Sequence, residues 1–211
     1  MNEKGILVVV SGFAGSGKGT LMKALLNQYE NYALSVSATT RNPRPGEAEG
    51  REYFFKTTEQ FEEMIRQGAF VEYAKYVNHY YGTPKAYVEE QLAAGKDVIL
   101  EIEIQGALQI KEKFPETLLL FITPPSAEVL YQRLTGRGTE DQKTIALRME
   151  RAREEAEMIP RYDYLIVNDR LEVCTAQIHS IIQGEHARTI RKKELICTMK
   201  EDLVHFLEGE R

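Results

Sequence analysis

The sequence predicts an α/β protein in which helices cover both faces of a parallel sheet. Two observations lead to this prediction: short, almost continuously apolar runs recur along the chain, and segments with helical periodicity separate them. Strands of a parallel sheet are buried on both faces and therefore read as apolar runs, and helices connect each strand to the next. With 211 residues, 43% of them hydrophobic, the chain can bury a sizeable core.

The expected strands are the apolar runs at 6–11, 97–104, 118–122 and 164–167. The expected helices have apolar residues at helical spacing and cover 21–29, 86–94, 127–134 and 145–158. Two insertions interrupt this alternation. Residues 37–84 are rich in tyrosine and arginine around a proline- and glycine-containing turn, followed by a strand-like stretch at 51–55, and residues 126–157 are mostly helical.

The second insertion contains a helix broken at Gly136 and Gly138 and then a highly charged helix. A thin apolar stripe runs along that charged helix, formed by Ile145, Met149, Ala152, Ala156 and Ile159. A weakly packed helix behind a glycine break is typical of a moving lid, because mobile elements are held by few contacts. An ordinary solvated surface helix is the alternative that these features leave open.

Composition excludes several classes of protein. The net charge of −5 argues against a general nucleic-acid binder, which needs a broad basic surface. No apolar run approaches the length of a membrane span and no leader pattern precedes the first strand, so we expect a cytoplasmic protein without a membrane partner. Cys174 and Cys197 are expected to be reduced thiols rather than part of a metal site or disulfide framework.

A glycine-rich loop follows the first expected strand and precedes the first expected helix. Its residues have the pattern G-x-x-x-x-G-K and then Gly-Thr: Gly12, Phe13, Ala14, Gly15, Ser16, Gly17, Lys18, Gly19 and Thr20. Strand, glycine loop and helix are the context in which successive backbone N–H groups and the helix N-terminus bind phosphate. Lys18 adds a mobile positive charge. Gly19 stands where a strict loop has Ser or Thr to meet Mg²⁺, and this variant is typical of nucleoside monophosphate kinases.

The first insertion contains a second candidate phosphate site. Arg41 and Arg44 lie three residues apart in a loop stiffened by prolines, and two such arginines can hold one phosphate bidentately. The hydroxyls of Tyr53 and Tyr81 can complete the cage. Taken singly, each arginine fits a solvated surface and each tyrosine a core position, so the combination carries the prediction.

Two carboxylates near the end of the second expected strand suit a metal ion. Glu101 and Glu103 are two residues apart and would share one face of a strand beside the glycine loop. Carboxylates in that position suit Mg²⁺ and its water molecules. The alternative is a pair of strand-end charges that face solvent.

Several further segments then follow in one order: 37–46, Tyr53, Glu72, 81–84, Gln105-Gly106-Ala107, Arg137-Gly138-Thr139 and Asn168-Asp169. On these segments the chain resembles the guanylate kinases, from about residue 5 to residue 187. The run S-A-T-T-R-x-P-R-P-G-E is highly specific for that family. The resemblance implies transfer of a phosphoryl group from ATP to GMP with Mg²⁺, giving ADP and GDP in purine nucleotide metabolism.

The resemblance also implies a division of the chain. An ATP-binding core would comprise 1–36, 85–125 and 158–187, a GMP-binding insertion 37–84, and a lid 126–157. Residues 188–211 have no clear match in the family; they contain a basic patch and an amphipathic helix, and their role is not readable from the sequence.

Site residues follow from the resemblance, position by position. The residues implied for ATP are the loop from Gly12 to Thr20 together with Asn168 and Asp169. Those implied for the GMP phosphate are Arg41, Arg44, Tyr53 and Tyr81. Those implied for the guanine side are Ser37, Glu72, Gly82, Thr83 and Glu103. Those implied for catalysis are Lys18, Arg41, Arg133, Arg137 and Arg148, with Thr20 and Glu101 on the metal.

The chain departs from the family pattern at two places within the matched region. Phe13-Ala14 replaces a usual Pro-Ser but keeps every glycine, and Glu101-Ile102-Glu103 replaces a usual D-I-D with side chains one methylene longer. Two other functions stay open: a non-catalytic guanylate-kinase-like module that binds proteins, and another small-molecule kinase, such as a ribose bisphosphate kinase. The retained lysine and arginines weigh against the first, and the guanine set against the second. The sequence does not predict the oligomeric state.

Overall fold

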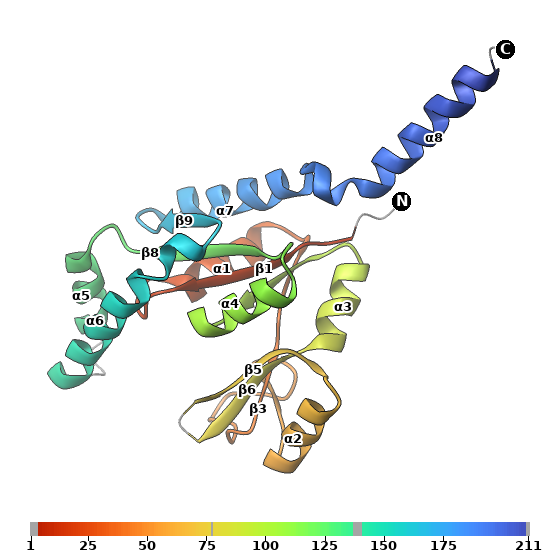
Figure 1. The fold of residues 1–211 in the computed structure, drawn as a ribbon. Helices are drawn as coiled ribbons and strands as arrows, with labels where there is room; N and C mark the ends of the chain where they lie inside the picture. The colour runs from red at the N-terminus through yellow and green to blue at the C-terminus, as the bar shows by residue number, and fades with distance from the viewer. Residues whose placement is uncertain (1–3, 77, 137–140, 210–211) are drawn as a thin grey trace.

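The computed structural model describes residues 4–76, 78–136 and 141–209. Its centre is a five-stranded sheet in which every pairing is parallel (Figure 1). In spatial order the strands are β2 (Tyr32–Leu34), β7 (Asp97–Glu101), β1 (Leu7–Gly12), β8 (Leu118–Thr123) and β9 (Tyr164–Val167). The predicted α/β class with a parallel sheet is therefore confirmed.

Helices cover both faces of this sheet. On one face α1 (Lys18–Gln28) and α7 (Leu171–His186) pack on Val8 and Val10 of β1. On the other face α3 (Lys85–Ala93) and α4 (Ile104–Lys113) share a core with Val9. Successive strand residues point to opposite faces, so one apolar run supplies both cores.

The carboxyl ends of the five parallel strands lie at the same edge of the central sheet, and the candidate site residues lie near this edge. Val10 pairs with Glu101 of β7 and Gly12 pairs with Ile122 of β8. The glycine loop after β1 therefore lies beside the carboxyl ends of β7 and β8. Crevices at this edge are where open parallel sheets bind their ligands.

The first insertion forms a second, four-stranded sheet, which lies below the central sheet in Figure 1. Its strands, in spatial order, are β4 (Tyr53–Phe55), β3 (Ser37–Thr39), β6 (His79–Pro84) and β5 (Phe70–Tyr76). Helix α2 (Thr58–Arg66) begins with a capping box between Thr57 and Gln60. Its Phe61 stacks on Phe70 with ring centroids 4.4 Å apart, which gives this sheet a small core of its own.

The second insertion supplies α5 (Ala127–Thr135) and α6 (Gln142–Ala156). The stripe predicted along α6 is confirmed: Ile145 and Ala152 are buried, while Leu147 on the same helix is 71% exposed. Phe13 of the glycine loop joins this cluster and meets Phe121 edge to face, with centroids 5.0 Å apart. Whether the two helices move as a lid stays a prediction, as does the division into core, insertion and lid.

The strand predicted at 97–104 is too long. Strand β7 ends at Glu101, and α4 begins at Ile104 with Glu103 as its N-cap residue. The apolar spacing changes there, since Ile104, Ala107 and Ile110 are buried at helical intervals. The argument that Glu101 and Glu103 share a strand face is therefore wrong. Strand β2 and helices α4 and α7 were not among the predicted elements, nor were β3, β5, β6 and α2 of the first insertion. A further short turn of helix, η1, covers Ile159–Arg161.

After α7 the chain forms a short turn, η2 (Thr189–Arg191), and the helix α8 (Lys193–Gly209). This helix projects away from the rest of the molecule (Figure 1). None of its side chains is buried. Across the described residues no helix has the length and apolar character that crossing a membrane requires.

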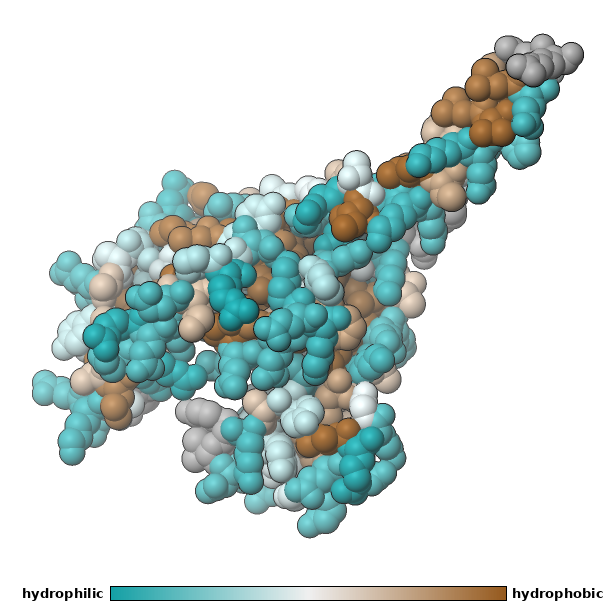
Figure 2. Space-filling view, viewed as in Figure 1, coloured by the Kyte–Doolittle hydropathy of each residue, from teal (hydrophilic) through white to brown (hydrophobic). Residues whose placement is uncertain are grey.

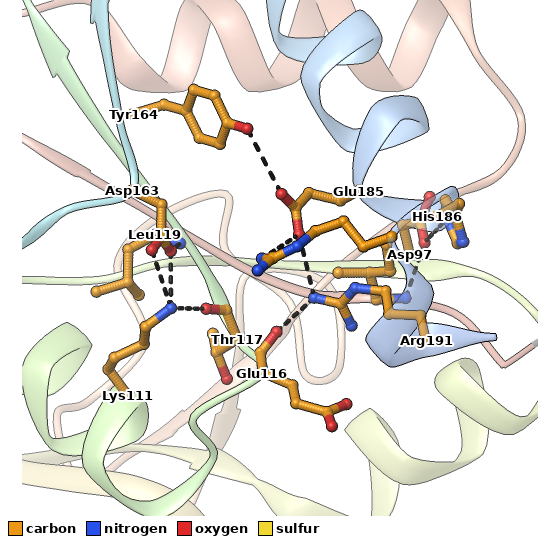
Figure 3. Close-up of polar contacts among 12 residues, drawn as sticks. Asp97, Lys111, Glu116, Thr117, Leu119, Asp163, Tyr164, Glu185, His186 and Arg191 are labelled. Carbon is orange, nitrogen blue, oxygen red and sulfur yellow. Dashed lines mark hydrogen bonds and ion pairs between the residues drawn. The ribbon is translucent and has the colours of Figure 1, made fainter. Parts of the chain in front are cut away.

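Asp97, at the start of β7, connects three segments of the chain through polar contacts of its carboxylate. Its carboxylate accepts hydrogen bonds from the backbone N–H of Ile6 at 2.8 Å and from Asn31 at 3.2 Å, and its Oδ1 lies 2.8 Å from Nε2 of His186 (Figure 3). The side chain is 1% exposed. Replacing Asp97 with alanine is expected to lower the free energy of unfolding by about 1–3 kcal/mol, because a buried N–H loses its acceptor.

The measurement is urea denaturation followed by circular dichroism. Asp202→Ala, on the exposed helix α8, is the matched control and is expected to leave the midpoint unchanged. Equal midpoints for Asp97→Ala and the unchanged protein would contradict this account of Asp97.

Candidate active site

The glycine loop is shaped to surround an anion. Gly15 and Gly17 have φ values of +87° and +90°, which side chains rarely adopt, and a Cβ on Gly17 would lie 2.5 Å from Nδ2 of Asn168. Nζ of Lys18 donates hydrogen bonds to the carbonyls of Gly12 at 2.6 Å and Phe13 at 3.2 Å. The lysine is thereby held over the loop at the point where α1 begins.

Two side chains from other elements hold the middle of the loop. Asn168, which follows β9, donates from Nδ2 to the carbonyl of Ser16 at 2.8 Å. Arg133 of α5 donates to the same carbonyl at 3.2 Å and to the carbonyl of Asn168 at 2.9 Å. The Ser16 hydroxyl is buried without a hydrogen-bond partner among the described residues. An unpaired buried donor inside a phosphate-binding loop is a group that a bound phosphate can satisfy.

A pocket of about 350 Å³ opens beside the loop. Its lining residues are Gly15, Gly17, Thr20, Arg133, Asn168, Asp169 and Leu171. The structure thus brings together loop residues, the predicted lid arginine Arg133 and the Asn-Asp pair, which are far apart in the sequence. Leu171 is the one lining residue that the sequence did not indicate.

Glu101 ends β7 next to the first turn of α1. Its carboxylate oxygens lie about 4 Å from where a Cβ on Gly19 would stand. Burial raises the pKa of the Glu101 carboxyl, and the nearby Lys18 ammonium opposes that rise. The described residues hold no group of three or more His, Cys, Asp or Glu that could bind a metal alone. Mg²⁺ in kinases uses one or two carboxylates together with substrate phosphates, so the oxygen donors of Glu101 and Thr20 fit this ion.

In the inserted sheet the predicted arginine clamp is organised by a carboxylate that the sequence analysis missed. Arg41 makes a bidentate pair with Glu47, both N–O distances being 2.9 Å, and the backbone N–H of Arg44 donates to the same carboxylate at 2.8 Å. Arg41 lowers the pKa of the Glu47 carboxyl, and this pairing raises the pKa of Arg41. Glu47 therefore occupies the guanidinium edge that a phosphate would use.

The two tyrosines predicted for this cage do lie beside Arg41. The rings of Tyr53 and Tyr81 are 6.0 Å apart, and the Arg41 guanidinium carbon lies 5.2 Å from the centre of the Tyr53 ring. Register explains the arrangement, because β3 pairs with both β4 and β6. Arg44 is exposed in the neighbouring turn.

Glu72 is a buried carboxylate that lies next to Gly106 of α4. It is 7% exposed, and Oε1 accepts a hydrogen bond from the Thr83 hydroxyl at 2.8 Å on the neighbouring strand. Burial raises the pKa of the Glu72 carboxyl, and the Thr83 hydrogen bond opposes that rise. Its Oε2 lies 3.3 Å from where a Cβ on Gly106 would stand, so glycine in α4 lets this carboxylate approach. The segment between Glu101 and Gly106 thus joins the two sites.

The remaining predicted residues are placed as follows. Ser37 begins β3, and a Cβ on Gly82 would lie 3.0 Å from Phe61 and Phe70, so close packing already accounts for that glycine. Glu103 is exposed and pairs with Arg151 of α6 at 3.0 Å. Arg148 lies on the same helix. Arg137 lies outside the described residues.

The parallel sheet with its glycine loop, and the inserted sheet with its buried carboxylate, define a P-loop protein with two neighbouring candidate ligand sites. Comparison with known proteins shows to which family of P-loop proteins the chain belongs. The sequence profile of the guanylate kinase family matches residues 4–185. The chain belongs to the guanylate kinase family.

Relatives and solved structures agree. The chain is 49% identical over 203 residues to a guanylate kinase of Lactococcus lactis, covering 96% of this chain and 99% of the relative. It is 51% identical over 189 residues to a guanylate kinase of Halalkalibacterium halodurans, covering 90% and 93%. The crystal structure of guanylate kinase from Anaplasma phagocytophilum superposes with a TM-score of 0.71 at 33% identity, covering 90% of each chain.

Proposed function

We propose that this protein transfers the γ-phosphoryl group of ATP to GMP, giving ADP and GDP, and that it serves purine nucleotide metabolism in the cytoplasm. The observation that carries the choice of GMP is the buried Glu72–Thr83 pair beside α4. Guanine presents N1–H and N2–H₂ side by side, two donors that match the two oxygens of one carboxylate. The family membership of the chain supports the same reaction.

The proposed mechanism depends on positioning and charge rather than on covalent catalysis. Phosphoryl transfer needs the attacking and leaving oxygens in line and needs neutralisation of the charge that spreads over the moving group. The phosphate of GMP is ionised near neutral pH, so no strong base is required. Lys18 and the glycine loop would hold the phosphates of ATP, and Arg41, Arg44, Tyr53 and Tyr81 would hold the phosphate of GMP.

Each bound phosphate changes a contact that is present in the structure. The GMP phosphate would take the Arg41 edge that Glu47 occupies. The ATP phosphates would draw Lys18 away from the carbonyls of Gly12 and Phe13. Arg133, Arg137 and Arg148 would add positive charge as the site closes, which also keeps water from the phosphoryl group.

Mg²⁺ would be held by Glu101 and Thr20 together with the phosphates of ATP. When bound, it neutralises phosphate charge. We therefore expect GDP formation to require a divalent cation. Excess chelator should abolish turnover, and added Mg²⁺ should restore it. Full turnover in chelator would contradict the metal assignment.

Acceptor choice tests the proposed function. In a coupled assay of ADP release, the purified chain is given ATP and Mg²⁺ with GMP, AMP, UMP or ribose bisphosphate. We expect rapid turnover with GMP and little with the other three. Preference for ribose bisphosphate or AMP would favour another small-molecule kinase, and no turnover with any acceptor would favour a non-catalytic module.

The arginines are expected to divide into two kinetic classes. Arg44→Ala should raise KM for GMP, because Arg44 would hold a phosphate that is present in the ground state. Arg137→Ala should mainly lower kcat, because an arginine of the lid engages fully only as the site closes. Steady-state kinetics in both substrates measures the difference. The same pattern for both variants would contradict the division into clamp and lid.

A further inference from the structure

Helix α6 carries an arginine that bridges two carboxylates. Arg151 donates from Nη2 to Oε2 of Glu103 at 3.0 Å and from Nε to Oε1 of Glu155 at 3.0 Å. Glu103 is the N-cap residue of α4, whereas Glu155 lies about one turn after Arg151 on α6. These three side chains therefore connect the second insertion to the residue that the resemblance places on the guanine side.

The contact with Glu103 depends on a position at which the chain departs from the family pattern. Glu103 stands where aspartate is usual, and its side chain is one methylene longer. Removing that methylene would withdraw the carboxylate by about 1 Å. A contact of 3.0 Å would then exceed hydrogen-bond range. The longer side chain thus allows this chain to pair Glu103 with α6.

Apolar packing fixes the position of α6. Ile145 and Ala152 of this helix are buried in one cluster with Phe13 of the glycine loop. Figure 2 shows mostly hydrophilic residues on the visible surface over α6. Arg151 directly precedes the buried Ala152, so the apolar stripe determines where Arg151 and Glu155 lie.

The same packing brings α6 close to Lys18. The carbonyl of Phe13 accepts a hydrogen bond from Nζ of Lys18 at 3.2 Å, while the Phe13 ring packs in the α6 cluster. The Glu155 side chain is 15% exposed. Burial raises the pKa of its carboxyl, and the positive charges of Arg151 and Lys18 oppose that rise. Lys18 and Glu155 therefore attract each other across the boundary between the loop and α6.

Charges of alternating sign thus connect the two candidate sites. Glu103 on the guanine side pairs with Arg151, Arg151 pairs with Glu155, and Glu155 attracts Lys18 in the glycine loop. Two carboxylates that share one arginine depend on each other. When one of them gains a different partner, the arginine interacts more strongly with the other.

We propose that Arg151 is a positioning residue that couples the binding of GMP to the binding of ATP. This inference rests on the proposed function, in which guanine lies beside Glu103. Guanine N–H groups on Glu103 leave Arg151 to pair with Glu155 alone. Glu155 is then neutralised more fully and attracts Lys18 less, so Lys18 turns more readily to the phosphates of ATP. By linkage, each ligand raises the affinity for the other by the same factor.

Isothermal titration calorimetry on the full chain measures this coupling. The ligands are GMP and adenylyl imidodiphosphate, an ATP analogue that does not transfer its terminal phosphoryl group, in the presence of Mg²⁺. Each Kd is measured alone and with the other ligand saturating, and the ratio of the two values is the coupling factor. We expect a factor above one in the unchanged protein. Arg151→Gln should lower it about two- to five-fold, the scale of an exposed ion pair.

Two further variants test whether the effect comes from the Glu103 contact. Arg153→Gln is the matched control, because Arg153 is an exposed arginine of the same helix that pairs with Glu150, and it should leave the coupling factor unchanged. Glu103→Asp keeps the carboxylate but withdraws it from Arg151, so it should lower the factor as Arg151→Gln does. The double variant should lower it no further, because both substitutions remove one contact.

The coupling factor is a comparison within one protein, so a substitution that only destabilises the fold does not change it. Thermal unfolding verifies that each variant is folded. An unchanged factor in Arg151→Gln, or additive effects of the two substitutions, would overturn this proposal and leave the proposed function intact. Failure of the unchanged protein to bind GMP would contradict the proposed function and this inference with it.

Discussion

Lys18→Ala is expected to lower kcat for GDP formation about 10²- to 10³-fold, the scale for losing one group that stabilises transition-state charge. Lys18 begins α1, and its Nζ lies over the loop within hydrogen-bond distance of the Gly12 and Phe13 carbonyls. Its charge matters most as negative charge develops on the transferring group. We therefore expect a smaller change in KM for ATP than in kcat.

Steady-state kinetics with varied ATP and saturating GMP measures both constants. Lys23→Ala is the matched control, because Lys23 is an exposed lysine on the same helix. That variant should keep the kinetic constants of the unchanged protein. A Lys18→Ala variant with unchanged kcat and an increased KM for ATP would mean that the lysine serves binding alone.

Glu72→Gln is expected to lower kcat/KM for GMP. The decrease should correspond to a loss of at least about 2 kcal/mol of transition-state stabilisation, the scale for leaving the partner of a charged group unsatisfied. The substitution keeps the shape of the side chain but exchanges one acceptor for a donor, which would then face a donor of guanine. Adenine has an acceptor at N1 and cannot pair with both carboxylate oxygens, so the rate with AMP should change much less. Sites built to hydrogen-bond a group discriminate strongly in this way.

The decisive quantity is the ratio of kcat/KM for GMP to that for AMP in the two proteins. Glu59→Gln, in the first turn of α2 of the same insertion, is the matched control. If Glu72→Gln leaves the ratio unchanged, the base is read elsewhere, with Glu103 and Ser37 the next candidates.

The Glu72 carboxyl should also impose a pH dependence: burial raises its pKa, and its protonated form accepts fewer hydrogen bonds. As the pH is lowered, kcat/KM for GMP should therefore begin to decrease at a higher pH than it would with a glutamate of ordinary pKa, because kcat/KM reports the protonation state of the unliganded enzyme.

The sequence predicted the central sheet well because burial on both faces leaves an unambiguous pattern. The run before the glycine loop and the run at 118–122 have almost no polar residues, and both are strands at close to the expected bounds. Residues 102–104 were misread because Ile102 and Ile104 continue the apolar alternation of β7 into the turn before α4. Period alone does not separate a strand end from the start of a buried helix.

The geometry of the site could be predicted where its residues are adjacent in the sequence. It could not be predicted where the contact partner of a side chain depends on the folded structure. The glycine loop is contiguous, so its geometry follows from its sequence. The pairing of Arg41 with Glu47 depends on the turn between them, and Arg41 could equally have faced solvent. Phe13, which stands where the family usually has proline, packs against Phe121 and the α5–α6 cluster. This contact depends on tertiary structure, so the sequence could not show that Phe13 connects the glycine loop to those helices.

The central claim is that the two adjoining sites pass a phosphoryl group from ATP to GMP rather than to water. One reaction mixture with ATP, GMP, Mg²⁺ and the purified chain tests this directly, with GDP and ADP separated by anion-exchange chromatography and inorganic phosphate measured by phosphorus NMR. The account predicts that GDP and ADP appear in equal amounts while inorganic phosphate stays at its starting level. Formation of ADP with inorganic phosphate and no GDP would contradict it.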